Sequence, residues 1–198
     1  MPNDAALAAI VERSYSDISW RAGELTGLYT LSSGYRIIAF PGTRMEIGDW
    51  LRDLDAIPRW TKYLGICHRG FFDGAVELLA ASPIPEHKYR GCVLVGHSLG
   101  AALALLIGGL LTVKGLKPSL IVTFGAPRCG SWKLRRVLRQ VPMRMYRNGD
   151  DPVPLVPWLP GLYVHPRPLI QIGEAALDPI EDHHIGAYRR ALAEITDA

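Results

Sequence analysis

Residues 93–100 read Val-Leu-Val-Gly-His-Ser-Leu-Gly, and the rest of the chain is organised around this stretch. The β-branched apolar run that opens it predicts a buried strand, and the apolar run at residues 101–113 predicts a long helix. A serine between two glycines therefore stands at a tight turn from strand to helix. This arrangement is typical of a nucleophile elbow, in which a strained turn exposes the serine hydroxyl above the edge of a sheet.

The tight turn at Ser98 leaves room only for small neighbouring residues, and Gly96 and Gly100 meet this requirement. The N-terminus of the following helix presents free N–H groups and a partial positive charge, which would stabilise a developing oxyanion. The alternative interpretation is that Ser98 merely caps the helix. The strand before it, the helix after it and the candidate partners downstream favour a nucleophile.

Length and composition limit the classes of protein to which this chain can belong. A chain of 198 residues can bury a substantial core, and we expect residues 1–198 to form a single domain. Hydrophobic residues make up 48% and charged residues 21%, which is typical of soluble globular proteins. The net charge of +3 gives no indication of nucleic-acid binding, and the oligomeric state stays open. A basic cluster comprises Lys133, Arg135, Arg136 and Arg139. The simplest interpretation is the exposed face of a helix, and the alternative is a patch that binds an anionic surface.

Cysteine usage and the N-terminal sequence bear on the compartment. The chain has three cysteines, Cys67, Cys92 and Cys129. They cannot all pair with one another, and none has the spacing of metal ligands. No signal peptide is visible in residues 1–16, and the longest apolar run, residues 99–113, is shorter than the ~20 residues that cross a bilayer. We therefore expect a cytoplasmic location, or release without a signal peptide, with reduced thiols.

Strand and helix patterns alternate along the chain. We expect strands at residues 24–31, 35–40, 93–95, 119–124 and 143–147, and a hairpin or two short edge strands at 162–164 and 169–172. We expect helices at residues 5–16, 47–57, 71–81, 101–113, 131–140 and from 183 to about 195. This alternation predicts an α/β fold with a mostly parallel sheet covered by helices on both faces. Reactive groups collect at the carboxyl ends of the strands in such sheets.

A serine nucleophile needs a base within hydrogen-bond reach, and the base needs an orienting carboxylate. In one common order along the chain, the serine comes first, then an aspartate or glutamate, then a histidine. This chain offers Ser98, then two adjacent aspartates at 150–151, then two adjacent histidines at 183–184. The order therefore predicts a catalytic triad.

The two aspartates are not equivalent. Pro152 fixes the backbone directly after Asp151, so we prefer Asp151 to Asp150 as the acid. The alternative is that both are ordinary turn aspartates. For the base, three histidines follow the aspartates, and we set His165 aside as a surface loop residue, which leaves His183 and His184. His97 lies inside the elbow, where we expect it to pack or bond locally.

An oxyanion hole needs two N–H donors. We expect one from Leu99, the residue after the nucleophile, and the other from the loop at residues 41–43. The Thr43 hydroxyl is a candidate third donor, although Thr43 taken alone is more simply a turn threonine.

Seven ordered motifs connect the chain with a known family. They are Phe-Pro-Gly-Thr at 40–43, Asp-Trp-Leu-Arg-Asp-Leu at 49–54, His-Arg-Gly-Phe at 68–71, Gly-His-Ser-Leu-Gly at 96–100, Thr-Phe-Gly-Ala-Pro-Arg at 123–128, Asp-Pro-Val-Pro at 151–154 and Asp-His at 182–183 followed by Tyr188. Together they resemble the class 3 lipases, the fungal-type lipases of the α/β-hydrolase fold. The resemblance implies that fold and supports Asp151 and His183 in the triad. The chain departs from the family at Pro41, where an arginine is usual.

The resemblance implies a serine carboxylic-ester hydrolase for acylglycerol-like or other lipophilic esters. His183 would deprotonate Ser98, the serine would attack the ester carbonyl, and water would release the acid from an acyl-enzyme, without a metal or cofactor. The expected partners are an ester or lipid substrate and a transient contact with a lipid surface. Two alternatives stay open: a thioesterase or acyltransferase with the same triad, and a non-catalytic binding module on the same fold.

Residues 47–57 follow the expected oxyanion loop directly and have helical apolar spacing. The apolar stripe consists of Ile47, Trp50, Leu51, Leu54 and Ile57. The segment matches the place where the family carries its lid, so we expect either a lid or an amphipathic helix packed permanently on the core.

Overall fold

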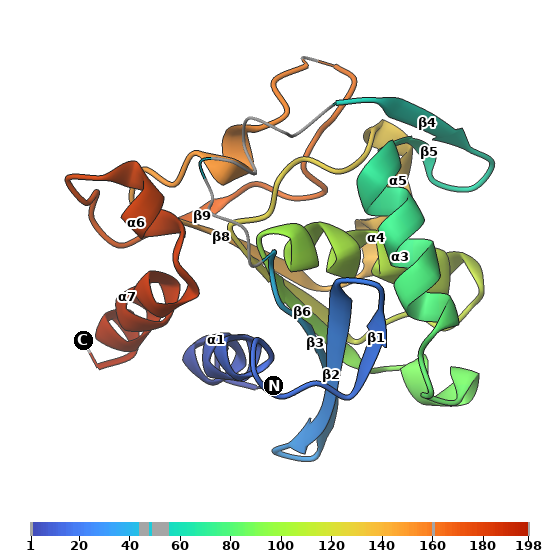
Figure 1. Ribbon diagram of the computed structural model, residues 1–198, viewed down its shortest axis with the longest axis horizontal. Coiled ribbons are helices and arrows are strands. Elements are labelled where there is room, and N and C mark those ends of the chain that lie inside the picture. The colour runs from blue at the N-terminus through green and yellow to red at the C-terminus, as the bar shows by residue number, and fades with distance from the viewer. Residues whose placement is uncertain (1, 44–47, 49–55, 160, 198) are drawn as a thin grey trace.

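The computed structural model describes residues 2–43, 48, 56–159 and 161–197, and a seven-stranded sheet runs through it (Figure 1). In spatial order the strands are β1 (Trp20–Ala22), β2 (Leu25–Ser32), β3 (Tyr35–Phe40), β6 (Val93–His97), β7 (Leu120–Phe124), β8 (Met143–Asn148) and β9 (Ile170–Ile172). The pairs from β3 to β9 are parallel, and β1 and β2 add an antiparallel edge. The sheet is therefore mostly parallel, as expected.

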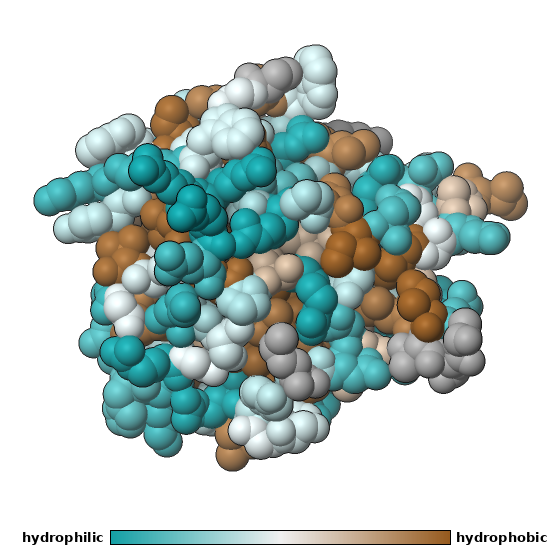
Figure 2. Space-filling model, turned by 180° about the vertical axis from the view of Figure 1, so that it is seen from behind, coloured by the Kyte–Doolittle hydropathy of each residue, from teal (hydrophilic) through white to brown (hydrophobic). Residues whose placement is uncertain are grey.

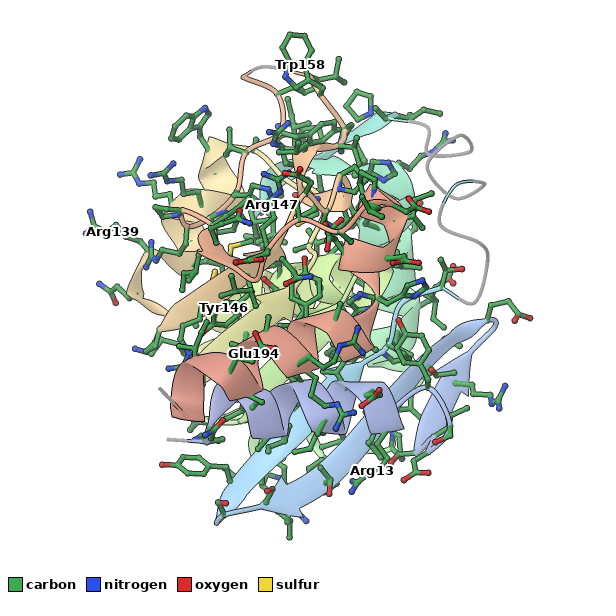
Figure 3. The ribbon with its side chains drawn as sticks, turned by 90° about the vertical axis from the view of Figure 1, so that its left-hand side faces the viewer. Arg13, Arg139, Tyr146, Arg147, Trp158 and Glu194 are labelled. Atoms are coloured by element: carbon green, nitrogen blue, oxygen red, sulfur yellow. The ribbon has the colours of Figure 1, made fainter. Side chains whose placement is uncertain are left out.

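Helices cover both faces of the sheet. One face carries α3 (Arg69–Ala80), α4 (Leu99–Val113) and α5 (Trp132–Val137), which bury their apolar residues in the larger core. The other face carries α1 (Asp4–Arg13) and α7 (Ile185–Asp197), which lie side by side in Figure 3. Eleven of the fifteen residues of α4 are buried, which explains why its sequence is apolar all round.

Strand alternation divides the core between these two layers. In β6, Val93 and Val95 face the α1 and α7 layer, whereas Leu94 faces α4. The parallel register pairs Phe40 with Gly96, and His97 with Phe124. The loops that follow these strands therefore open at one edge of the sheet, around the elbow.

The segment between residues 58 and 68 differs from the sequence-based expectation. The chain forms a hairpin of β4 (Pro58–Thr61) and β5 (Gly65–His68) where the pattern indicated irregular structure. Most side chains of β4 are exposed, so the strand lacks the alternating apolar residues that would have indicated it.

Two expectations for the C-terminal third were wrong. Residues 162–164 do not form a strand, because Val164 makes only an isolated bridge with Gly130, and β9 instead pairs in parallel with β8. The single helix expected from residue 183 is divided into α6 (Pro179–His183) and α7, because His184 between them has an extended backbone with ψ 135°. Short 3-10 helices cover Glu86–Tyr89, Leu138–Gln140 and Val153–Leu155.

The expected helix at residues 47–57 lies outside the described residues except for positions 48, 56 and 57. Its candidate lid residues Ile47, Trp50, Leu51 and Leu54 are all among those not described. In the part of the chain that the structure covers, no helix combines the length and hydropathy of a membrane span. The surface seen from behind mixes hydrophilic side chains with scattered apolar ones (Figure 2).

Candidate active site

The elbow has the strained geometry that its sequence predicts. Ser98 is buried with φ 54° and ψ −126°, a conformation that a non-glycine residue seldom adopts. A Cβ at position 96 would lie 2.3 Å from the Gly100 carbonyl oxygen, and one at position 100 would lie 2.2 Å from the Phe40 and Pro41 oxygens. Only glycine therefore allows the oxyanion loop to approach the start of α4 so closely.

Asp151 and His183 meet in a fully buried pair. The Nδ1 atom of His183 lies 2.8 Å from Oδ2 of Asp151, and both side chains are inaccessible to solvent. Tyr188 donates its hydroxyl to the same oxygen at 2.5 Å, and the Val153 N–H donates to Oδ1 at 2.8 Å. Burial, and secondly the charge of Asp151, raise the pKa of Tyr188 well above its usual value, so the hydroxyl stays a donor. Three donors therefore hold this carboxylate in one orientation.

The other ring nitrogen of His183 is available for chemistry. Its Nε2 atom is buried and has no hydrogen-bond partner within the described part of the chain. The His183 ring lies 4.7 Å, centroid to centroid, from the ring of His97, the residue before Ser98. Because Nδ1–H donates to Asp151, Nε2 carries the lone pair of a neutral imidazole. Such a nitrogen can accept a proton.

The neighbouring candidates face elsewhere. The Asp150 side chain is 65% exposed and lies 3.8 Å from the Arg147 guanidinium. His184 is exposed as well. The structure therefore brings Asp151 and His183 together and leaves Asp150 and His184 at the surface.

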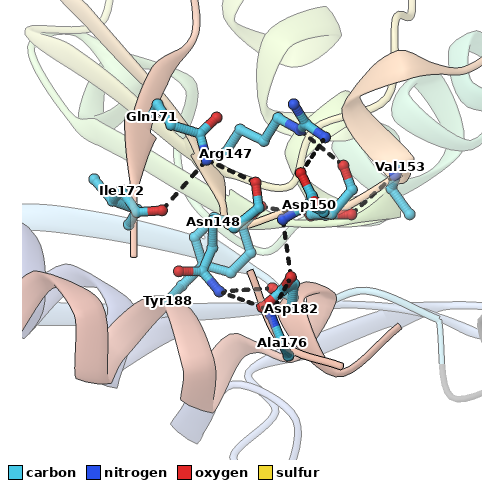
Figure 4. Close-up of polar contacts among 11 residues, drawn as sticks. Arg147, Asn148, Asp150, Val153, Gln171, Ile172, Ala176, Asp182 and Tyr188 are labelled. Carbon is cyan, nitrogen blue, oxygen red and sulfur yellow. Dashed lines mark hydrogen bonds and ion pairs between the residues drawn. The ribbon is translucent and has the colours of Figure 1, made fainter. Parts of the chain in front are cut away.

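A second carboxylate joins the loops that carry the acid and the base (Figure 4). Asp182 is buried and accepts hydrogen bonds from the N–H groups of Asp150 at 2.8 Å and Ala176 at 3.1 Å. The side-chain amide of Asn148 donates to the Asp182 carbonyl oxygen at 3.1 Å. Sequence reasoning quoted Asp182 only as part of a motif, yet it fixes the backbone on both sides of the Asp151–His183 pair.

We expected His97 to pack or bond locally, but both of its ring nitrogens bond residues that are distant in sequence. Its Nδ1 atom lies 2.6 Å from the Tyr15 hydroxyl, and its Nε2 atom lies 2.6 Å from the His183 carbonyl oxygen. The Gly42 N–H in turn donates to the Tyr15 oxygen at 2.8 Å. The partners lie 82 and 86 residues away in sequence, so no local pattern could have revealed them.

Burial fixes the direction of this chain of hydrogen bonds. It lowers the pKa of His97 well below 6.5, with a smaller contribution from His183, and raises the pKa of Tyr15 to about 12. A neutral imidazole has one N–H, which the His183 carbonyl requires on Nε2, so Nδ1 accepts from the Tyr15 hydroxyl. The chain runs from Gly42 through Tyr15 and His97 to His183, and thus joins the loop after β3, the elbow and the candidate base.

A cavity of about 360 Å³ opens beside the elbow, within the size range of small-molecule sites. Its lining comprises Tyr15, Arg21, Glu24, Leu25, Thr26, Pro41, Gly42, Thr43, Leu99 and Leu103. Both expected oxyanion donors, Thr43 and Leu99, therefore border the same space. The Gly42 backbone stands close to Ser98, since a Cβ at position 42 would lie 2.8 Å from the serine Cβ.

Comparison with known proteins places the sequence in a family. A family described as lipase (class 3) matches residues 37–160. The secreted mono- and diacylglycerol lipase A of Penicillium camembertii is 38% identical over 179 residues, which cover 84% of this chain and 57% of that protein. The secreted mono- and diacylglycerol lipase 1 of Fusarium solani is 35% identical over 147 residues, covering 68% and 43%. The chain thus spans about half the length of these relatives.

Solved structures show the fold. The Rhizomucor miehei lipase propeptide complex superposes with a TM-score of 0.74 at 21% identity, covering 86% of this chain and 68% of that one. A mutant form of the lipase MDLA from Penicillium cyclopium gives 0.65 at 21% identity, covering 89% and 79%. The expected α/β-hydrolase fold is confirmed.

The expected cytoplasmic location was wrong. The finding that overturns it is that the relatives from Penicillium and Fusarium are named as secreted proteins. The argument from the cysteines failed because all three thiols are free and buried. Burial keeps a thiol from oxidants and from partner cysteines in either compartment, so reduced cysteines do not indicate the cytoplasm.

Proposed function

Because the chain belongs to the class 3 lipase family, we propose that it is a single-domain serine carboxylic-ester hydrolase with a triad of Ser98, Asp151 and His183. The observation that carries the proposal is the buried His183, whose Nδ1 is bound to Asp151 while Nε2 has no partner among the described residues. A histidine arranged in this way next to a strained serine turn is what a nucleophilic serine requires.

The reaction proceeds through an acyl-enzyme. His183 Nε2 accepts the Ser98 hydroxyl proton while Oγ attacks the ester carbonyl, and the resulting imidazolium then protonates the leaving alkoxide. Water, deprotonated by the same nitrogen, attacks the acyl-enzyme and releases the carboxylic acid and the free serine. Asp151 stays ionised and stabilises the imidazolium in both halves of the cycle.

The negative oxygen of each tetrahedral intermediate needs donors that are already in place. Leu99 begins α4, so its N–H belongs to the positive end of that helix. Thr43 contributes from the loop after β3, on the same cavity. The close approach of that loop to Gly100 holds both donors at fixed positions without reorganisation.

The substrates are acylglycerol-like or other lipophilic esters. The matched relatives are named for mono- and diacylglycerols. The cavity beside the elbow supports a substrate of this kind, because Leu25, Pro41 and Leu103 give it apolar walls for an acyl chain.

The test uses Ser98→Ala together with a fluorophosphonate probe. We expect the variant to lose about 10⁶-fold in kcat on a p-nitrophenyl ester and to lose probe labelling. Ser33→Ala is the matched control, since Ser33 also has a positive φ but lies exposed in a turn far from the elbow in sequence. Turnover of Ser98→Ala within tenfold of the parent would remove Ser98 as the nucleophile.

A further inference from the structure

The charge of the chain is unevenly distributed. Residues 56–72 and 125–149 contain ten lysines and arginines and no aspartate or glutamate. The rest of the chain has twelve basic and nineteen acidic residues and is therefore net negative. The small overall charge thus conceals two strongly basic segments, which makes their placement in the fold informative.

The fold brings these two segments into contact. The tip of the β4–β5 hairpin lies against the start of α5, where the Lys133 ammonium donates to the Lys62 carbonyl oxygen at 2.7 Å. The Ser131 hydroxyl accepts from the Ile66 N–H at 3.2 Å. An isolated bridge joins Cys67 to Gly130, so the hairpin and the segment before α5 are held as one unit.

Cations and aromatic rings alternate on this surface. We define the basic aromatic patch as Lys62, Tyr63, Trp132, Lys133, Arg135 and Arg136. Tyr63 is 53% and Trp132 58% exposed. The Lys62 ammonium lies 5.4 Å from the Tyr63 ring centroid, and the Arg135 guanidinium 4.8 Å from that of Trp132. Among the residues that the structure describes, no carboxylate forms an ion pair with these four cations.

The patch adjoins the loops of the candidate active site. The segment that begins at Gly125, beside His183 and Asp151, leads directly to α5. Arg128 in this segment donates to the carbonyl oxygens of Leu155 and Pro157, in the loop that carries Trp158. Trp158 is 74% exposed and projects from one end of the molecule, and Arg139, next to the patch in sequence, projects from its side (Figure 3).

We propose that the basic aromatic patch binds a lipid surface carrying anionic headgroups. The four cations, which have no carboxylate partner among the described residues, are attracted to such a surface. Each lysine or arginine raises the partitioning of a protein onto an anionic membrane about fivefold. Tyrosine and tryptophan favour the boundary between headgroups and acyl chains. The exposed aromatic rings therefore favour a lipid surface over a partner that is attracted by charge alone. The inference rests on the proposed function, because a hydrolase of lipophilic esters meets its substrate at such a surface. A helix face that is merely solvated would explain neither the exposed rings beside the cations nor the lack of carboxylate partners among the described residues.

The test measures binding of the full chain to vesicles without any ester substrate, so its outcome is independent of catalysis by Ser98. One set of vesicles is phosphatidylcholine alone, and the other contains a third of phosphatidylglycerol. We expect preferential binding to the anionic vesicles that weakens as salt is added. The double variant Lys133→Gln/Arg136→Gln is expected to lower partitioning onto them about 30-fold.

The matched control is Lys88→Gln/Arg90→Gln, which removes the same charge from two exposed positions that do not belong to the patch. We expect it to change partitioning less than about threefold, since charges beyond a Debye length of about 8 Å are screened. Melting temperatures verify that both variants fold, and Trp132→Ala offers a second probe of the patch. Equal losses in the two double variants, or no preference for anionic vesicles, would overturn the proposal. So would binding to single-stranded RNA that depends on Lys133 and Arg136 while vesicle binding does not.

Discussion

Tyr188→Phe isolates one of the three hydrogen bonds that hold the candidate acid. The hydroxyl is fully buried and donates to Asp151 Oδ2 at 2.5 Å, the same oxygen that faces His183 Nδ1. Phenylalanine fills the same space without the donor, so the change removes the bond and leaves no large cavity.

The size of the effect follows from the charge of the acceptor. A hydrogen bond to an ionised group contributes about 1.5–3 kcal/mol. At about 2–4 °C per kcal/mol for a chain of this length, the melting temperature should fall by about 3–12 °C.

The same change should move the pH profile in a defined direction. Without the Tyr188 donor, more of the Asp151 charge is available to the imidazolium form of His183, which becomes more stable. The acid limb of kcat/KM is therefore expected to move to higher pH in the variant than in the parent. Tyr188 does not titrate in this range, because burial holds its pKa well above the usual value.

Tyr146→Phe provides a matched control in the same chain. The Tyr146 hydroxyl also donates to a carboxylate at 2.5 Å, that of Asp4, and the side chain is nearly buried. We expect a comparable loss of melting temperature with an unchanged acid limb, measured on a soluble p-nitrophenyl ester. If both variants left the limb in place, Asp151 would not be coupled to the group that titrates in the reaction.

Two further pairs of substitutions distinguish each candidate residue from its neighbour in sequence. Asp151→Asn should lower kcat about 10⁴-fold, whereas Asp150→Asn, at an exposed position, should change it only slightly; steady-state kinetics that gave the reverse ranking would move the acid to Asp150. His183→Ala should lower kcat about as far as loss of the nucleophile, some 10⁶-fold, while His184→Ala retains most turnover; equal retention by both histidine variants would leave the reaction without its proposed base.

The sequence predicts best where a segment's own pattern decides its structure. The strand at residues 35–40 has the expected bounds, because an apolar run lies between a turn glycine and a proline. The β4–β5 hairpin escaped prediction because β4 is mostly exposed. The break at His184 is a change in one residue's backbone, which no periodicity records.

The residues of the candidate site were likewise predictable only in part. Ser98, Asp151 and His183 could be selected from motif order, and the structure brings the last two into contact, while their catalytic roles stay predictions. Tyr15 and the true partners of His97 could not be selected, because their contacts join residues more than 80 positions apart. Only the folded sheet makes these residues neighbours.

The hydrogen-bond chain from Tyr15 to His183 couples two segments that lie far apart in the sequence, the one after α1 and the one before α7. Tyr15 follows α1, His183 precedes α7, and these helices pack together with an ion pair between Glu12 and Arg189 at 2.9 Å. Parts of a folded protein can open locally, in cooperative units smaller than the whole. Sub-global opening of α1 would free Tyr15 and leave the His183 carbonyl without its His97 contact, although the central sheet stayed folded. Opening of α1 alone is therefore expected to inactivate this protein on heating before its sheet is lost.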